Sequence, residues 1–180
     1  YPTADVLFSG PMKRCLETAQ ILYPGQTPII IPEWTEMDFG AFEGHNYQEL
    51  SKDPNYQRWI DSGGTLPFPE GESRGEFIRR SVAGYEKMVY HMKMIWERSA
   101  ASGQGDRMIQ SVSAVVHGGT IMALLSHFLG GEYFDYQAKC GQGYSGRLAF
   151  KAGKGAPQWK EFRPLSEVTV SELTKGETNG

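Results

Sequence analysis

Short apolar runs in this chain are separated by longer stretches in which apolar residues recur every three or four positions. The runs predict strands at Val6–Phe8, Pro28–Ile31 and Val112–Val116. The third run is almost continuously apolar, which is typical of a strand buried on both faces of a parallel sheet. Two later runs predict edge strands joined by a turn at Gly153–Pro157: Arg147–Lys151 and Gln158–Phe162.

Helical periodicity fills the segments between the strands. A helix is predicted from Met12 to Tyr23, and Pro11 suits its first position because a proline's missing N–H has no intrahelical partner there anyway. The longest predicted helix runs from Arg74 to Ser99. Its apolar stripe is typical of packing against the protein's own core: Ile78, Val82, Tyr85, Val89, Met92 and Trp96. Shorter helices are predicted at Tyr47–Lys52, Pro54–Asp61 and 121–129. Connections and a frayed tail are predicted elsewhere: Glu33–Gly44, Leu66–Ser73, Ala101–Arg107 and the residues from Lys175.

This order of elements predicts the fold class. Strands that alternate with helices imply an α/β sheet whose ligands bind at the carboxyl ends of the strands. With 180 residues the chain is long enough for one buried core, so we expect a single domain over 1–180. Its 39% hydrophobic and 22% charged residues are those of an ordinary globular protein rather than a disordered one.

The net charge and the cysteine content limit which classes of partner and which cellular compartment we expect. A formal net charge of −3 gives no reason to expect a nucleic-acid partner. No apolar run is long enough for a membrane span, and Cys15 and Cys140 do not form a metal-type pair, so we expect free thiols and a cytoplasmic protein without a membrane partner. The chain opens at Tyr1 without an initiator methionine, which suggests a longer gene product.

Residues that could take part in binding or catalysis lie where predicted strands end. His117 follows an apolar run and precedes Gly118 and Gly119, where a helix start offers backbone N–H groups and the positive end of a helix dipole to an anion. Arg14 lies in the first turn of the helix after the first strand, so its guanidinium can reach back to grip a phosphate. Each of these residues, taken alone, is also compatible with a structural or surface role.

Three carboxylates compete for the role of general acid in the run Trp34–Gly44. Position alone does not choose among Glu36, Asp38 and Glu43, and any of them can instead cap backbone amides in a glycine-rich loop. The remaining histidines lack metal-ligand spacing and are interpreted as structural or surface residues: His45, His91 and His127. The run Gly141–Gly146 matches G-x-G-x-x-G, but a strand rather than a helix is predicted after it, so we interpret it as a loop or hairpin entry.

Four motifs, taken in order, resemble the histidine phosphatase superfamily, which includes phosphoglycerate mutase-like and α-ribazole phosphatase-like enzymes. The motifs are Phe8–Ala19, Glu36–Gly44, Glu70–Ser73 and Val116–Gly119, and the resemblance extends from about residue 4 to about residue 129. It implies a phosphoglycerate mutase-like fold, a three-layer α/β sandwich with a mostly parallel central sheet flanked by helices. It also implies catalysis through a phosphohistidine, with neither metal nor organic cofactor.

The resemblance assigns roles residue by residue. Arg14 resembles a phosphate-binding arginine, Glu36 the proton donor to the leaving oxygen, and His117 the second histidine that steadies the transferring phosphoryl group. Gly118, through its N–H, and Ser9 are further candidates for substrate binding. The expected partner is a small phosphorylated metabolite or inorganic phosphate, and a homo-oligomer is left open.

One departure from the family pattern changes the functional prediction. The family's nucleophile lies in an Arg-His-Gly motif on a first strand, and none of the four histidines has that context. The run Leu173–Asn179 echoes the motif faintly but has no histidine. The resemblance therefore predicts a phosphomonoesterase whose nucleophilic histidine lies outside this sequence, with the given chain alone inactive. Two alternatives are an anion-binding module without catalysis on the same scaffold and a phosphoglycerate mutase-type phosphotransferase.

Overall fold

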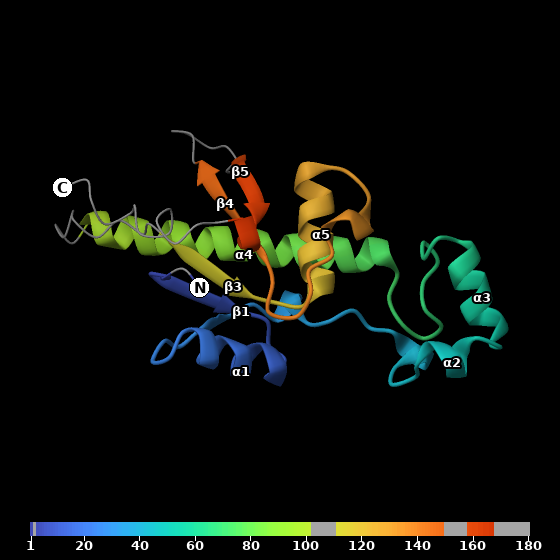
Figure 1. Cartoon of the computed structure of the whole chain (residues 1–180). Coiled ribbons are helices and arrows are strands. Elements are labelled where there is room, and N and C mark those ends of the chain that lie inside the picture. The colour runs from blue at the N-terminus through green and yellow to red at the C-terminus, as the bar shows by residue number, and fades with distance from the viewer. Residues whose placement is uncertain (2, 102–110, 150–157, 168–180) are drawn as a thin grey trace.

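The computed structural model describes residues 1, 3–101, 111–149 and 158–167 (Figure 1). The strands are β1 (Val6–Ser9), β2 (Ile29–Ile30), β3 (Val112–Val115), β4 (Tyr144–Ala149) and β5 (Gln158–Pro164). The α-helices are α1 (Lys13–Leu22), α2 (Tyr47–Leu50), α3 (Pro54–Asp61), α4 (Arg74–Ala101) and α5 (Gly118–Leu129). Short 3₁₀ helices are η1 (Pro32–Trp34), η2 (Gly40–Phe42), η3 (Tyr133–Tyr136) and η4 (Leu165–Glu167).

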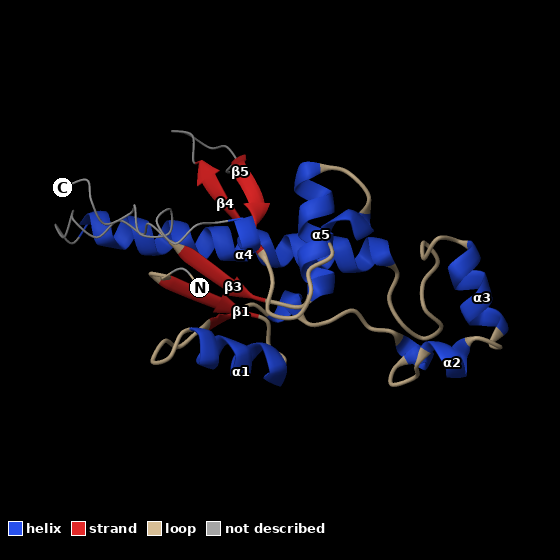
Figure 2. Cartoon of the chain, viewed as in Figure 1, coloured by secondary structure: helices blue, strands red, loops and turns tan. Residues whose placement is uncertain are grey.

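A parallel sheet in the order β2-β1-β3 forms the centre of the fold. Side chains alternate between the two faces of β1, so Leu7 and Phe8 enter different clusters. Leu7 packs with Ala19 and Tyr23 beside α1, whereas Phe8 packs with Tyr85 and Met88 of α4. Helices therefore cover both faces of the sheet (Figure 2), and the predicted three-layer α/β arrangement with a parallel sheet is confirmed.

The long helix α4 behaves as its apolar stripe predicts. Tyr85 and Met92 are buried in the cluster that covers the sheet, and Val89 packs against it. The side chain of Trp96 lies outside the described part of the chain. Helix α4 also contacts α5, which stands across it in Figure 1.

Strands β4 and β5 form a separate antiparallel hairpin, which stands apart from the parallel sheet in Figure 2. The glycine-rich run at 141–146 turns at Gly141, whose φ is 76°, and continues into β4 rather than into a helix. The interpretation of that run as a hairpin entry is therefore confirmed. The predicted connection over 102–107, the turn at 153–157 and the tail from residue 175 lie outside the described residues.

Strand β3 is less buried than its sequence predicts. Its register with β1 is parallel, as expected, but Ala114 is exposed and the other three residues are only partly buried. The physical reason is its place in the sheet, since β3 pairs with β1 and with no second strand among the described residues. The prediction of full burial on both faces is wrong for the described fold.

Two helix starts also differ from the predictions. Helix α1 begins at Lys13 with Met12 as an extended N-cap, so Pro11 precedes the helix instead of occupying its first position. Helix α5 begins at Gly118, three residues before the predicted start, with His117 as its N-cap. The loop at 33–44 begins within η1 and contains η2, and sequence periodicity does not resolve these helices because each has three residues.

Helices α2 and α3 form a lobe beyond the end of the central sheet (Figure 1). Asn46 and Asp53 cap the two helices through their side-chain oxygens, and Pro54 occupies the first turn of α3. Aromatic rings hold the lobe to the neighbouring loops, with Trp59 stacked between Tyr56 and Phe68. In the described part of the chain, no helix combines the length and the apolar character that crossing a membrane requires.

Candidate functional site

The site forms where β1 and β3 end side by side. Their register pairs Ser9 with Val115, and carboxyl ends of parallel strands share one edge of the sheet. Arg14 follows β1 in the first turn of α1, and His117 follows β3 at the start of α5. The chain after η1 brings Glu36 to the same place, so three residues from separate motifs converge.

Their polar atoms are within a few ångströms of one another. The Nε of Arg14 donates a hydrogen bond to Nδ1 of His117 at 3.1 Å. Oε2 of Glu36 lies 3.6 Å from Nη2 of Arg14 and 3.3 Å from Nδ1 of His117. We call these three residues the anion cluster, because a guanidinium and an imidazole meet at the end of a parallel sheet.

The anion cluster opens to solvent on one side. The side chain of His117 is only 5% exposed, that of Glu36 24%, and that of Arg14 58%. A small anion arriving from solvent therefore meets the guanidinium first. The first turn of α5, at Gly118, adds N–H groups that have no intrahelical partner.

His117 is held as a neutral imidazole. Burial lowers its pKa below the ordinary value of 6.5, the carboxylate of Glu36 opposes this, and the charge of Arg14 lowers the pKa further. Because the net direction is downward, the ring carries one proton at pH 7. The contact with Glu36 becomes an ion pair only when the ring gains a second proton.

Glu36 owes its position to a tight fit and to an anchored loop. Its Oε1 accepts a hydrogen bond from the backbone N–H of Met37 at 3.0 Å. A Cβ on Gly119 would lie 2.9 Å from that same Oε1 and 3.3 Å from the ring of Phe77, so a side chain there would push the carboxyl group of Glu36 out of place. Gly119 thus lets the start of α5 approach the carboxylate.

Arg80 of α4 fixes the chain that carries Glu36. Its Nη1 donates to the carbonyl oxygens of Glu33 at 2.7 Å and Thr35 at 2.9 Å, and its Nη2 to that of Glu36 at 3.3 Å. The same Nη2 pairs with Glu72 at 2.5 Å. One half-buried cation therefore anchors the loop by its carbonyl groups and leaves the carboxylate of Glu36 to face the cluster.

The other predicted candidates have different surroundings. Asp38 accepts a hydrogen bond from the N–H of Gly40, which is the capping role left open for it, and Glu43 is exposed at the C-cap of η2. Ser9 is fully buried and its hydroxyl donates to the carbonyl oxygen of Gly10 at 2.9 Å. The structure does not bring the hydroxyl of Ser9 to the anion cluster, and its proposed role in binding stays a prediction.

Two further residues touch the site without a sequence signal of their own. Sγ of Cys15 lies 3.3 Å from Nε2 of His117. Tyr133 donates from its hydroxyl to the carbonyl oxygen of Gly119 at 3.3 Å, and burial, assisted by the charge of Glu36, raises the pKa of its phenol to about 12. Only the position of Cys15 next to Arg14 in the sequence could have singled it out.

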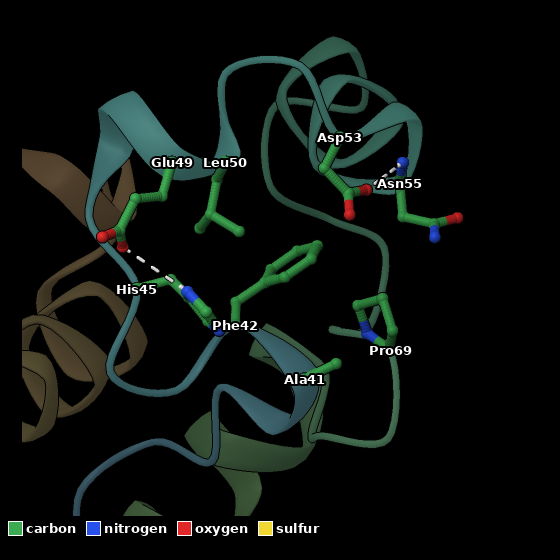
Figure 3. Close-up of a pocket in the computed structure, with 8 residues that line it drawn as sticks. All are labelled: Ala41, Phe42, His45, Glu49, Leu50, Asp53, Asn55 and Pro69. Atoms are coloured by element: carbon green, nitrogen blue, oxygen red, sulfur yellow. Dashed lines mark hydrogen bonds and ion pairs between the residues drawn. The ribbon is translucent and has the colours of Figure 1, made fainter.

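A pocket of about 490 Å³ lies elsewhere, between η2 and the lobe of α2 and α3 (Figure 3). Its polar groups serve the lobe itself, since Asp53 caps α3 and Glu49 completes the capping box of α2 and pairs with His45. The residues that line it are Ala41, Phe42, His45, Glu49, Leu50, Asp53, Asn55 and Pro69. None of them belongs to the anion cluster. Among the described residues, no three His, Cys, Asp or Glu side chains are arranged to hold a metal ion.

Three of the solved structures with a similar fold come from different organisms. An α-ribazole phosphatase from Shigella flexneri is 20% identical over 74% of this chain and 61% of its own, with a TM-score of 0.54. A protein described as an α-ribazole-5'-phosphate phosphatase from Escherichia coli is 22% identical over 73% of this chain and 60% of its own, with a TM-score of 0.53. A phosphoserine phosphatase mutant from Entamoeba histolytica, in complex with phosphoserine, is 22% identical over 88% of this chain and 73% of its own, with a TM-score of 0.55.

The chain therefore spans about 60% of the length of the two proteins first named, and these likenesses bear on the fold alone. No curated protein matches it. The sequence profile of the histidine phosphatase superfamily (branch 1) matches residues 2–158, a range that contains all three members of the anion cluster. The chain belongs to the histidine phosphatase superfamily.

Proposed function

We propose that this protein is a phosphomonoesterase that acts on a small phosphorylated metabolite through a phosphohistidine, with the nucleophilic histidine outside residues 1–180. The observation that carries the proposal is the convergence of Arg14, Glu36 and His117 within 3.1 to 3.6 Å at the end of the parallel sheet. A cation, a hydrogen-bonding imidazole and a carboxyl group are the groups that phosphoryl transfer from an ester needs.

Each member of the anion cluster has one role in this proposal. Arg14 binds two phosphoryl oxygens, and His117, with the N–H of Gly118, stabilises the charge that develops on them. The nucleophilic imidazole attacks phosphorus while the P–O ester bond breaks and the leaving oxygen takes a proton from the carboxyl group of Glu36. A water molecule then attacks the phosphohistidine, returns a proton to Glu36 and releases phosphate.

The edge of the sheet supports a nucleophile supplied from outside this sequence. Within the described residues β3 is paired on one side only, although its sequence is that of a strand buried in a parallel sheet. A further strand on that edge would end beside His117. Such a strand would bring a second imidazole to the cluster, which has only one.

A second candidate function is an anion-binding module without catalysis. It is favoured by the single imidazole of the anion cluster, because no second imidazole faces His117 in the described residues. The module would bind phosphate through Arg14 and His117 but would turn over no ester.

Hydrolysis of p-nitrophenyl phosphate separates the two functions. We expect the native gene product to hydrolyse it through an acid-labile phosphohistidine that can be trapped, and to have a mass above that of residues 1–180. We expect residues 1–180 alone to bind inorganic phosphate without turnover. A native protein of only 20.1 kDa that binds phosphate and hydrolyses nothing would establish the module instead.

Glu36→Gln tests the proton donor in the native enzyme. The substitution should lower the rate of hydrolysis of alkyl phosphates far more than that of p-nitrophenyl phosphate, since an activated aryl leaving group needs little protonation. Equal slowing of both substrates would assign Glu36 a role other than acid catalysis.

A further inference from the structure

The thiol of Cys15 touches the anion cluster but has no part in the proposed chemistry. Cys15 is the third residue of α1, it is buried, and its Sγ lies 3.3 Å from Nε2 of His117. The opposite ring nitrogen, Nδ1, faces Arg14 and Glu36. The ring of His117 is thus held between a sulfur on one side and the charged members of the cluster on the other.

The hydrogen bonds fix where the proton of His117 resides. A guanidinium has donors only, so Nδ1 accepts the hydrogen bond from Arg14 and carries no proton. A neutral imidazole then has its proton on Nε2, which points at Sγ of Cys15. Burial raises the pKa of the Cys15 thiol, against the opposing charge of Arg14, so the sulfur stays a thiol and accepts this hydrogen bond.

The sulfur of Cys15 is enclosed by the protein, since only 4% of the residue is exposed. A Cβ on Gly10 would lie 3.6 Å from Sγ of Cys15 and 2.7 Å from the carbonyl oxygen of Trp34. The bare backbone of Gly10 therefore forms one wall of the space that Cys15 occupies, and His117 forms another. A sulfur confined in this way defines the orientation of the ring that it contacts.

We propose that Cys15 is a positioning residue: its sulfur accepts the Nε2–H of His117 and so keeps Nδ1 directed at the place where the phosphoryl group binds. The identity of that ligand rests on the proposed function, whereas the tautomer of the unliganded ring does not. When an anion draws Arg14 away from Nδ1, that nitrogen becomes the site at which the ring gains its second proton.

The tautomer of His117 is the first test. Side-chain ¹⁵N NMR of residues 1–180 should show His117 as the Nε2–H form in the parent chain, in Cys15→Ser, which keeps an acceptor, and in Cys140→Ala, which removes the exposed cysteine. In Cys15→Ala the ring loses the acceptor that holds it in this orientation, so it can turn away from the Nε–H of Arg14, and a substantial Nδ1–H population should appear. An Nδ1–H ring in the parent chain, or an unchanged tautomer in Cys15→Ala, would overturn the proposal.

Phosphate binding is the second test, by calorimetry at pH 7 with inorganic phosphate. Losing one weak hydrogen bond should reduce the affinity of Cys15→Ala about fivefold, while Cys15→Ser and Cys140→Ala stay close to the parent. Equal affinity in Cys15→Ala refutes the positioning role.

If the parent chain itself binds no phosphate, the proposed function fails and the NMR result alone decides about Cys15. If Cys15→Ala does not fold, a loss of the Nε2–H form in Cys15→Ser overturns the proposal.

Discussion

The anion cluster and the pocket beside α2 and α3 both gather charged side chains, but they differ in what those side chains do. In the pocket, Asp53 and Glu49 already accept backbone N–H groups as helix caps. In the cluster, Arg14 and His117 contact chiefly one another and Glu36, and these contacts can be exchanged for contacts to an anion. The pocket beside α2 and α3 is therefore the poorer candidate, and the availability of polar atoms is a better guide to function than the presence of a cavity.

The largest expected effect comes from removing the cluster's cation or imidazole. Arg14→Ala and His117→Ala should each lower turnover of p-nitrophenyl phosphate by the native enzyme by about 10²–10³-fold, because each removes a donor to the developing charge. Circular dichroism and thermal melts should show a folded protein. Turnover within a factor of two of the parent in both variants would reject the cluster as the catalytic site.

A matched pair of glycines gives the next largest effect. In Gly119→Ala the new Cβ meets Oε1 of Glu36 at 2.9 Å, whereas in Gly118→Ala it lies 3.8 Å from the carbonyl oxygen of Ala138. Displacing the carboxyl group should cost Gly119→Ala about 10- to 100-fold in turnover, and Gly118→Ala should stay near the parent. Steady-state kinetics on both variants makes the comparison, and equal losses would mean that the helix start rather than Glu36 is responsible.

On the pocket side the expected effect is on stability alone. Asp53→Ala removes the side chain that caps α3 and should lower the free energy of unfolding by about 1 kcal/mol. Urea denaturation measures that loss, and calorimetry should find phosphate affinity unchanged. A loss of phosphate binding on this substitution would move the functional site toward the lobe.

The smallest effect is a pH dependence that reports on the cluster's charges. The pKa of His117 is below 6.5 in the folded chain, so the unfolded chain takes up its proton first as the pH falls. The stability linked to His117 is thus complete above pH 6.5 and is lost as the pH drops through the folded pKa. NMR titration should show that Arg14→Ala raises this pKa, by removing a cation, and that Glu36→Gln lowers it, by removing an anion. Shifts in the opposite directions would contradict the electrostatics described here.

Sequence patterns predict the framework of this molecule well because its core is built from local regularities. The strand at Val6 and the long helix from Arg74 follow periods of apolar residues that survive folding. Helix starts are less well predicted, because Met12 and His117 cap α1 and α5 through backbone geometry without a side-chain hydrogen bond. The burial of β3 is predicted wrongly, since a strand's neighbours are not encoded in its own residues.

The candidate site, too, can be predicted from the sequence only in part. His117 and Arg14 are identifiable because each directly follows a predicted strand, and their motifs resemble those of a known family. The family resemblance selects Glu36 over Asp38, which the position of these residues in the loop does not. The part played by Cys15 needs the three-dimensional contact, because His117 lies 102 positions away in the sequence. Arg80 illustrates the same limit, since its role depends on carbonyl groups that no side-chain pattern reveals.

The crowding around Gly10 has a consequence for how this protein tolerates change. Any side chain at that position must displace the main chain at Trp34, and its Cβ would pack directly against the sulfur that contacts His117. A saturation screen scored by growth or by catalysis would therefore mark Gly10 as intolerant, although it bears no reactive group. Such a residue constrains the evolution of the site as firmly as the residues that perform its chemistry.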